Sequence, residues 1–307
     1  MNARLFRMLS AGALMALTLS PALSVRAAPL APAAVFFEGF ETGTAGWITA
    51  PTRVSSGTNG IVSFEGGFHG ESHAGDFTRW GGYSSVFPPG GYTTFLALYL
   101  DMATGAANDT RFDFSSAIND SAGNHRRDFV LTGGFYNDSD FTGSGPRFVF
   151  SVSNTSPGWP KNPGRSPYAI TASGWITIEH RFYDAGAGVL AVDVTLRNPA
   201  GAALSTWTLS DPSDLIGSTV GGNRYGWFVT NFFPYLAIDN ALLILPPQCT
   251  TDCYVDAATG NDSNGGTSVV DAKKTIQAAI NQVNVGGTVH VAAGTYNEDV
   301  SANKANV

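Results

Sequence analysis

The chain has 307 residues, 43% of them hydrophobic, and carries a formal net charge of −7 at pH 7. This length allows about two domains, each with a hydrophobic core. The acidic balance is unfavourable for binding nucleic acid or anionic membrane surfaces, so we expect neither as a partner. Only 13% of the residues are charged, whereas glycine occurs 36 times and phenylalanine 20 times. This composition favours short strands joined by tight turns.

Residues 1–27 have the pattern of a signal peptide. Residues 1–7 hold two arginines and no acid, and residues 8–19 are apolar or small throughout. This run is too short to span about 30 Å of hydrocarbon, and the compact Val25 and Ala27 fit positions before a cleavage site. We predict cleavage after Ala27, a secreted or cell-surface location and no membrane insertion of the mature chain. An uncleaved membrane anchor is the alternative.

Residues 28–245 contain many short runs that alternate or are apolar and that end at Gly, Asn, Asp or Pro. The sequence around 198–201, Asn-Pro-Ala-Gly, predicts a hairpin connection between two such runs. No stretch with a helical period lies among them, so the pattern predicts an antiparallel sandwich or jelly roll. Clear examples of these runs are residues 94–100, 147–152, 175–182, 189–196 and 225–229.

Three motifs in this region resemble the concanavalin-like jelly rolls found in secreted bacterial proteins. They are residues 37–47, residues 90–101 and residues 236–243, which correspond to the first, a middle and the last part of such a module. The resemblance implies a concanavalin-like β-sandwich over residues 28–245. It does not choose a function, because modules of this kind bind sugars, cleave them or have no assigned role.

The catalytic patterns of related jelly rolls are absent from residues 28–245. Glucanases use a Glu-x-Asp-x-x-Glu strand, and no glutamate here has that spacing. Alginate lyases resemble one another in a Gln-x-His and a Tyr-x-Lys strand, but this module has no Gln and its only Lys is Lys161. We therefore expect a non-catalytic module that binds or presents glycan. The alternatives are the N-terminal part of a polysaccharide lyase or hydrolase with its groove beyond residue 307, and a structural or adhesive surface protein.

Aromatic rings are the candidate sugar-binding groups, because an exposed flat ring stacks on the face of a sugar. The rings of one candidate platform flank a proline-rich loop, which also supplies two cationic hydrogen-bond donors. The second candidate platform consists of the two rings of a Trp-Gly-Gly-Tyr sequence. Rings that fold over the core and close one end of the sandwich are the alternative. The candidate carbohydrate-binding residues are Trp159, Tyr168, Lys161, Arg165, Trp80 and Tyr83.

Residues 124–128, Asn-His-Arg-Arg-Asp, form the main positively charged segment of the module. Arg111 and Asp113 lie on a strand that we expect to be its neighbour. Bidentate arginines bind a uronate or a sulfate well. The alternative is cross-strand ion pairing that fixes the register of the sheet.

Glu38, Glu41 and Asp239 are candidate ligands of a structural Ca²⁺ ion. The first two lie near the first strand and Asp239 lies in the last, and the terminal strands of jelly rolls often pair. Carboxylate oxygens suit Ca²⁺, which takes 6 to 8 oxygen ligands. The resemblance to calcium-stapled jelly rolls implies such a site, and solvated turn carboxylates are the alternative.

Residues 246–253 form a predicted linker that contains both cysteines of the chain, Cys249 and Cys253. The linker begins with two prolines, which cannot donate to a sheet and therefore end the preceding strand. In an exported protein we expect the two cysteines to form a mutual disulfide. A metal site and pairing with cysteines beyond residue 307 are the alternatives.

Residues 254–307 resemble the beginning of a right-handed parallel β-helix of the pectin-lyase type. The resemblance rests on the order of three motifs, at residues 254–268, 274–283 and 286–298. Within the second motif, apolar residues at i, i+4 and i+7 predict a short helix with one apolar face, which would cover the open edge of the β-helix. Stacked coils need several rungs to bury a core, so the resemblance implies a domain that is incomplete here.

Overall fold

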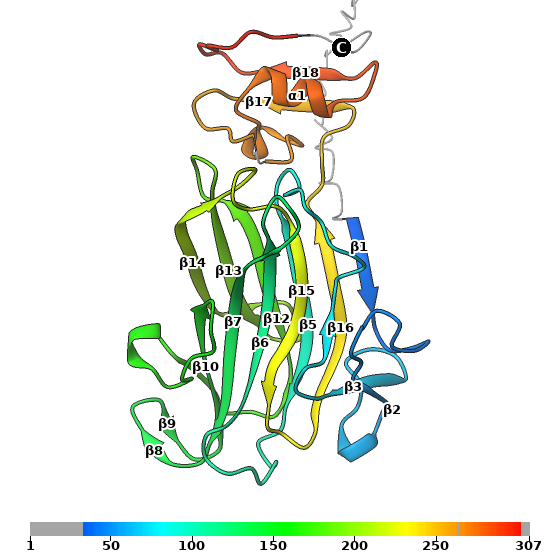
Figure 1. Cartoon of the computed structure of the whole chain (residues 1–307), viewed down its shortest axis with the longest axis vertical. Coiled ribbons are helices and arrows are strands. Elements are labelled where there is room, and N and C mark those ends of the chain that lie inside the picture. Colours follow the sequence, from blue (N-terminus) through cyan, green and yellow to red (C-terminus); the bar gives the residue numbers. More distant parts are fainter. Residues whose placement is uncertain (1–32, 263, 302–307) are drawn as a thin grey trace, which may run out of the picture.

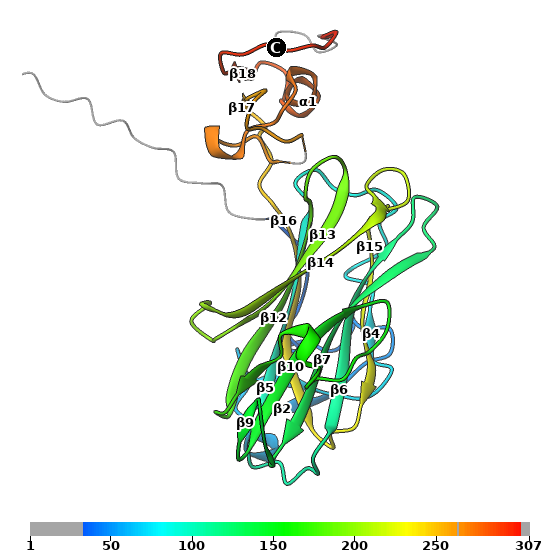
Figure 2. The same ribbon diagram turned by 90° about the vertical axis from the view of Figure 1, so that its left-hand side faces the viewer.

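The computed structural model describes residues 33–262 and 264–301, and the predicted signal peptide lies outside this part of the chain. Most of the strands that the structure describes belong to two antiparallel β-sheets that pack face to face (Figures 1 and 2). The predicted antiparallel β-sandwich is therefore confirmed.

The larger sheet has eight strands, in the order β14-β13-β12-β5-β16-β3-β2 with β1 paired to β16. Its strands are β1 (Ala33–Glu38), β2 (Thr52–Ser55), β3 (Phe68–Ser72), β5 (Tyr92–Leu100), β12 (Gly174–Asp184), β13 (Val189–Arg197), β14 (Ala203–Leu215) and β16 (Leu236–Leu245). The first and last strands of the sandwich thus pair, as the sequence predicts.

The smaller sheet has six strands, in the order β11-β10-β7-β6-β15-β4. Its strands are β4 (Phe77–Thr78), β6 (Thr110–Asn119), β7 (His125–Tyr136), β10 (Arg147–Asn154), β11 (Tyr168–Ile170) and β15 (Asn223–Asn231). A short hairpin of β8 (Ser139–Asp140) and β9 (Gly143–Ser144) follows β7, and single 3₁₀ turns occur at η1 (Thr58–Gly60) and η2 (Pro163–Arg165).

The core lies between the two sheets and is filled by alternate residues of each strand, because successive side chains of a strand point to opposite faces. On the larger sheet, Leu96 and Ile178 are register partners and both are fully buried. On the smaller sheet, Phe114 and Phe150 point into the same core. All five runs that the sequence predicts as strands are strands in the structure, and the 198–201 segment connects β13 to β14.

The C-terminal elements lie at one end of the sandwich (Figure 1). β17 (Asp252–Val255) pairs in parallel with β18 (Thr288–Val291), and η3 (Val269–Asp271) and α1 (Ile276–Gln282) lie between them in the chain. The predicted helix is confirmed: Thr275 caps its N-terminus, and Ile280 and Val283 are buried. One parallel strand pair does not make a β-helix, so that finer assignment stays a prediction.

A disulfide joins Cys249 and Cys253, which confirms the predicted pairing. Both cysteines are buried in a small second core with Val255 and Ala279. Gln248 Nε2 donates to the carbonyl oxygen of Pro89, 2.9 Å away, and so fastens the linker to the sandwich. Among the helices that the structure describes, none is long and apolar enough to cross a membrane.

Candidate functional site

Aromatic side chains gather on the outer face of the six-stranded sheet. Successive side chains of a strand point to opposite faces, and Phe228 of β15 is fully buried in the core. Tyr225 and Trp227 therefore point away from the core. Phe77 of β4 is the register partner of Trp227, so it shares this face. We call the set Phe77, Tyr83, His125, Tyr225 and Trp227 the aromatic surface.

Tyr225 lies at the centre of the aromatic surface. Its ring centroid is 5.9 Å from that of Phe77, 5.7 Å from that of Trp227 and 6.0 Å from that of His125, with the His125 ring stacked parallel. Tyr83 is 41% exposed. A shallow pocket of about 370 Å³ is lined by four of these rings and by Arg224 and Gly75. The rings are therefore accessible to a ligand without any rearrangement.

Gly226 makes the aromatic surface compatible with the packed core behind it. A Cβ atom at this position would lie 2.3 Å from the Trp80 ring. Trp80 fills this space on the inner side of β15 and is only 3% exposed. The Tyr-Gly-Trp sequence therefore places two rings outside while a third ring packs against the backbone between them.

Asp128 lies beneath the aromatic surface and is 8% exposed. Its Oδ1 accepts hydrogen bonds from Ser115 Oγ at 2.8 Å and Trp227 Nε1 at 3.3 Å. Its Oδ2 lies 2.9 Å from His125 Nε2. These contacts orient the indole of Trp227 and the imidazole of His125, and they leave the carboxylate fully engaged.

The phenol of Tyr225 is held in its neutral form. Burial, and to a smaller extent the charge of Asp128, raises its pKa to about 12. At neutral pH the hydroxyl is therefore protonated and can both donate and accept a hydrogen bond.

Trp159 and Tyr168, which the sequence places on one platform, differ in burial. Trp159 is 46% exposed on the loop before η2. Tyr168 is the register partner of Phe150, a fully buried residue, and its ring packs against the core. Tyr168 therefore follows the alternative in which the ring closes the core. Sugar binding by Trp159 stays a prediction.

Of the two cations of the proline-rich loop, Lys161 pairs with carboxylates of the protein, whereas the buried Nη1 of Arg165 has no hydrogen-bond partner among the described residues. Lys161 Nζ lies 3.0 Å from Asp138 and 2.7 Å from Asp140, and the fully buried Arg147 pairs with the same two carboxylates. Burial lowers the pKa of Lys161, but its hydrogen bonds to Asp140 and Asp138 outweigh this effect and raise it overall. Arg165 is half-buried. Lys161 is therefore engaged within the protein, and ligand binding by either cation stays a prediction.

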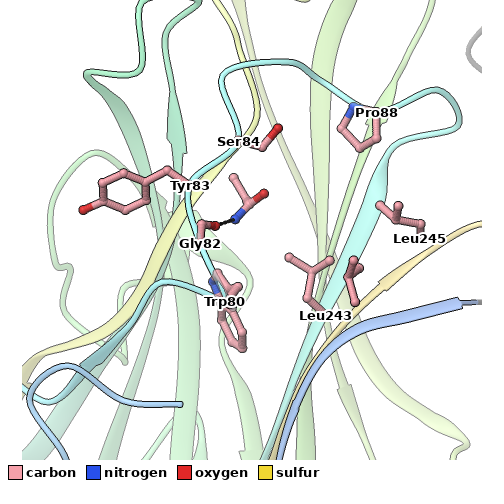
Figure 3. Close-up of a pocket in the computed structure, with 10 residues that line it drawn as sticks. Trp80, Gly82, Tyr83, Ser84, Pro88, Leu243 and Leu245 are labelled. Carbon is pink, nitrogen blue, oxygen red and sulfur yellow. Dashed lines mark hydrogen bonds between the residues drawn. The ribbon is translucent and has the colours of Figure 1, made fainter. Parts of the chain in front are cut away.

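Trp80 and Tyr83 point in different directions, as Figure 3 shows. Trp80 packs edge-on against Phe36 in the core, whereas Tyr83 is directed away from Leu243 and belongs to the aromatic surface. A pocket of about 310 Å³ opens between this loop and β16. The second predicted platform thus contributes one residue to the candidate site, Tyr83.

The charged segment 124–128 divides between the candidate site and an ion-pair network. His125 and Asp128 belong to the aromatic surface and its support, as described above. Arg126 Nε lies 2.8 Å from Asp214, and Arg127 pairs with both Asp214 and Asp211. These pairs connect β7 to β14, which belong to different sheets, so they join the sheets and do not fix the register of neighbouring strands.

Glu38, Glu41 and Asp239 do not form a single cluster. Within residues 33–262 and 264–301, no group of three or more His, Cys, Asp or Glu side chains is arranged to hold a metal ion. Both oxygens of Glu38 accept backbone N–H groups, from Phe40 and Gly46. Asp239 is fully buried, and burial raises its pKa to about 6. Calcium binding at these residues stays a prediction.

Only one of the five residues of the aromatic surface, Tyr83, is among the binding residues that the sequence predicts. Tyr225 and Trp227 occur in a predicted strand, and their i, i+2 spacing already places them on one face. His125 occurs in the charged segment. What the sequence lacks is the register that brings Phe77 beside Trp227.

No protein-family model matches the chain, and no match is found among curated proteins. Among solved structures, the chain is similar to the CBM2 module of the evolved Dit of Lactobacillus casei BL23 phage J-1, with 9% identity, a TM-score of 0.36 and coverage of 69% of this chain and 95% of that one. It is also similar to the PL-14 alginate lyase from Aplysia kurodai, with 11% identity, a TM-score of 0.32 and coverage of 64% and 87%. A legume lectin-like domain from Entamoeba histolytica matches with 10% identity, a TM-score of 0.26 and coverage of 57% and 81%. Similarity at this level does not identify a function.

Proposed function

We propose that this is a secreted or cell-surface protein whose sandwich binds polysaccharide through the aromatic surface without cleaving it. The observation that carries the proposal is the group of accessible rings around Tyr225 on the outer face of the six-stranded sheet. Flat rings of this kind stack on the apolar faces of sugars. The hydroxyl of Tyr225 and the imidazole of His125 supply polar contacts beside the rings.

The absence of cleavage is part of this proposal and rests on the state of the polar groups. Tyr225 keeps its proton at neutral pH, Asp128 is engaged by three donors, and Lys161 is paired with two carboxylates. A glycosidase needs one carboxylic acid and a second carboxylate placed about 5 to 10 Å apart across the scissile bond. Asp128 is 8% exposed and is hydrogen-bonded to Ser115, His125 and Trp227, which favours a role in orienting these side chains.

Replacing Tyr225 by Ala should weaken binding to a retained polysaccharide by about 2 kcal/mol, roughly 30-fold, because the central ring of the surface is lost. Tyr225→Phe keeps the ring and should retain most of the affinity. Affinity electrophoresis with the full chain measures both. Tyr235→Ala is the control, since Tyr235 is 55% exposed at a different site. Equal losses for Tyr225→Ala and Tyr235→Ala would contradict the assignment.

We also propose that Asp239 and Glu41 bind a structural calcium ion. The negative charge of Glu41 contributes to the raised pKa of Asp239. A bound ion would compensate the cost of burying this carboxylate. Calcium at about 100 times its dissociation constant should then stabilise the fold by about 2.7 kcal/mol, and a chelator should lower the melting temperature. An identical melting temperature with calcium and with chelator would remove the proposal.

A further inference from the structure

Two arginines lie over the aromatic surface without an acidic partner. The guanidinium carbon of Arg79 is 4.4 Å from the ring centroid of Tyr83, and that of Arg224 is 4.9 Å from the same ring and 5.4 Å from Tyr225. Within the described residues, neither guanidinium has a carboxylate within 4.0 Å. The positive charges of this face are therefore available to a ligand.

This arrangement differs from that of most cations in the sandwich. The paired ones are Arg126, Arg127, Arg147, Lys161, Arg181 and Arg197. Arg224 is held in place by neutral groups instead: its Nη1 donates to Asn119 Oδ1 at 3.2 Å and to the carbonyl oxygen of Gly123 at 3.0 Å. A guanidinium positioned by neutral acceptors has no neighbouring carboxylate to compensate its charge.

The acidic net charge of the chain does not prevent binding of an anion here. At physiological ionic strength the Debye length is about 8 Å, so distant surface charges are screened while the two nearby arginines are not. Asp128, the carboxylate beneath the surface, is 8% exposed and is hydrogen-bonded to three donors. The accessible cationic groups that contact the rings are Arg79 and Arg224.

We propose that the ligand of the aromatic surface is an acidic polysaccharide. Arg79 and Arg224 bind its carboxylate or sulfate groups, because a guanidinium matches either anion with two parallel hydrogen bonds. Tyr225 and Trp227 stack on the sugar faces between these groups. This inference rests on the proposed function and adds the class of polysaccharide to it.

The test uses the full chain and pairs of polymers that differ in charge alone: polygalacturonate with its methyl ester, and dextran sulfate with dextran. We expect retention on the anionic member of at least one pair and about tenfold weaker binding to its neutral counterpart, with affinity falling as ionic strength rises. Arg79→Gln and Arg224→Gln should each weaken binding to the anionic polymer about tenfold. Arg181→Gln is the control, because Arg181 is exposed on the other sheet.

The outcomes separate this inference from the proposed function. Binding to a neutral polymer that depends on Tyr225 but not on Arg79 or Arg224 would overturn the acidic class and leave polysaccharide binding intact. Binding that needs the arginines but is unchanged in Tyr225→Ala would overturn the inference, since charge attraction alone would explain it. No retention on any polymer would refute the proposed function itself.

Discussion

Replacing Arg147 by Met should lower the free energy of unfolding by about 3 kcal/mol, because the change removes one partner of a buried charge network. Arg147 is fully buried and contacts Asp138 at 3.0 Å and Asp140 at 2.9 Å. Its Nη1 also donates to the carbonyl oxygens of Asp138 and Gly145. The β8–β9 hairpin and the proline-rich loop, through Lys161, depend on the same two carboxylates.

Urea-induced unfolding at pH 7 measures this effect, and Arg181→Met is the matched control. Arg181 is 56% exposed and its nearest carboxylate oxygen, on Asp193, is 3.9 Å away. Exposed pairs of this kind contribute about 0 to 1 kcal/mol. Similar losses for the two variants would show that Arg147 does not hold the network together.

Replacing His180 by Phe should raise the free energy of unfolding at pH 4 by about 3 kcal/mol relative to the wild type. His180 is fully buried between Phe114 and Phe182, and burial lowers its pKa from 6.5 to about 4. The unfolded chain takes up a proton below about pH 6.5, whereas the folded chain does not until about pH 4. Histidine therefore makes stability increase from pH 4 to pH 6.5, and the advantage of the variant shrinks over the same range.

The quantity to compare is the difference in the free energy of unfolding between the variant and the wild type at each pH. The free energy of either protein alone would not be enough, because Asp239 changes it with pH in the opposite direction to His180. Its raised pKa of about 6 makes the folded chain hold a proton that the unfolded chain has already lost, so this residue lowers stability as pH rises from about 4 to 6. His290→Gln serves as the control, since His290 is 43% exposed. Parallel stability curves for His180→Phe and the wild type would contradict the prediction.

The strands of the sandwich were predictable because each run carries its own signal. The run at 189–196 is largely apolar, six of its eight residues are buried, and β13 contains it completely. The pairing of β1 with β16 followed from the resemblance to jelly rolls and not from the residues themselves. The C-terminal helix was predictable from the spacing of Ile276, Ile280 and Val283: the first and last pack in the small core, and Ile280 is buried.

The candidate site was less predictable because it depends on contacts between distant segments. Lys161 looked available to a ligand because its partners, Asp138 and Asp140, precede it by more than twenty residues and approach it only in the folded sheet. Trp227 and Phe77 became neighbours through a register that the sequence does not specify, and a slip of one residue would reverse the face. Local patterns placed Tyr225 and Trp227 in a strand but did not indicate the surface that they form with Phe77.

Non-catalytic binding is tested by incubating the full chain with a panel of acidic and neutral polysaccharides, scored for retention and for new reducing or unsaturated ends. We expect retention on at least one acidic polymer, loss of that retention in Tyr225→Ala, and no new ends at any time. Either new ends that accumulate with the wild type but not with Tyr225→Ala, or an absence of retention on every polymer, would contradict it.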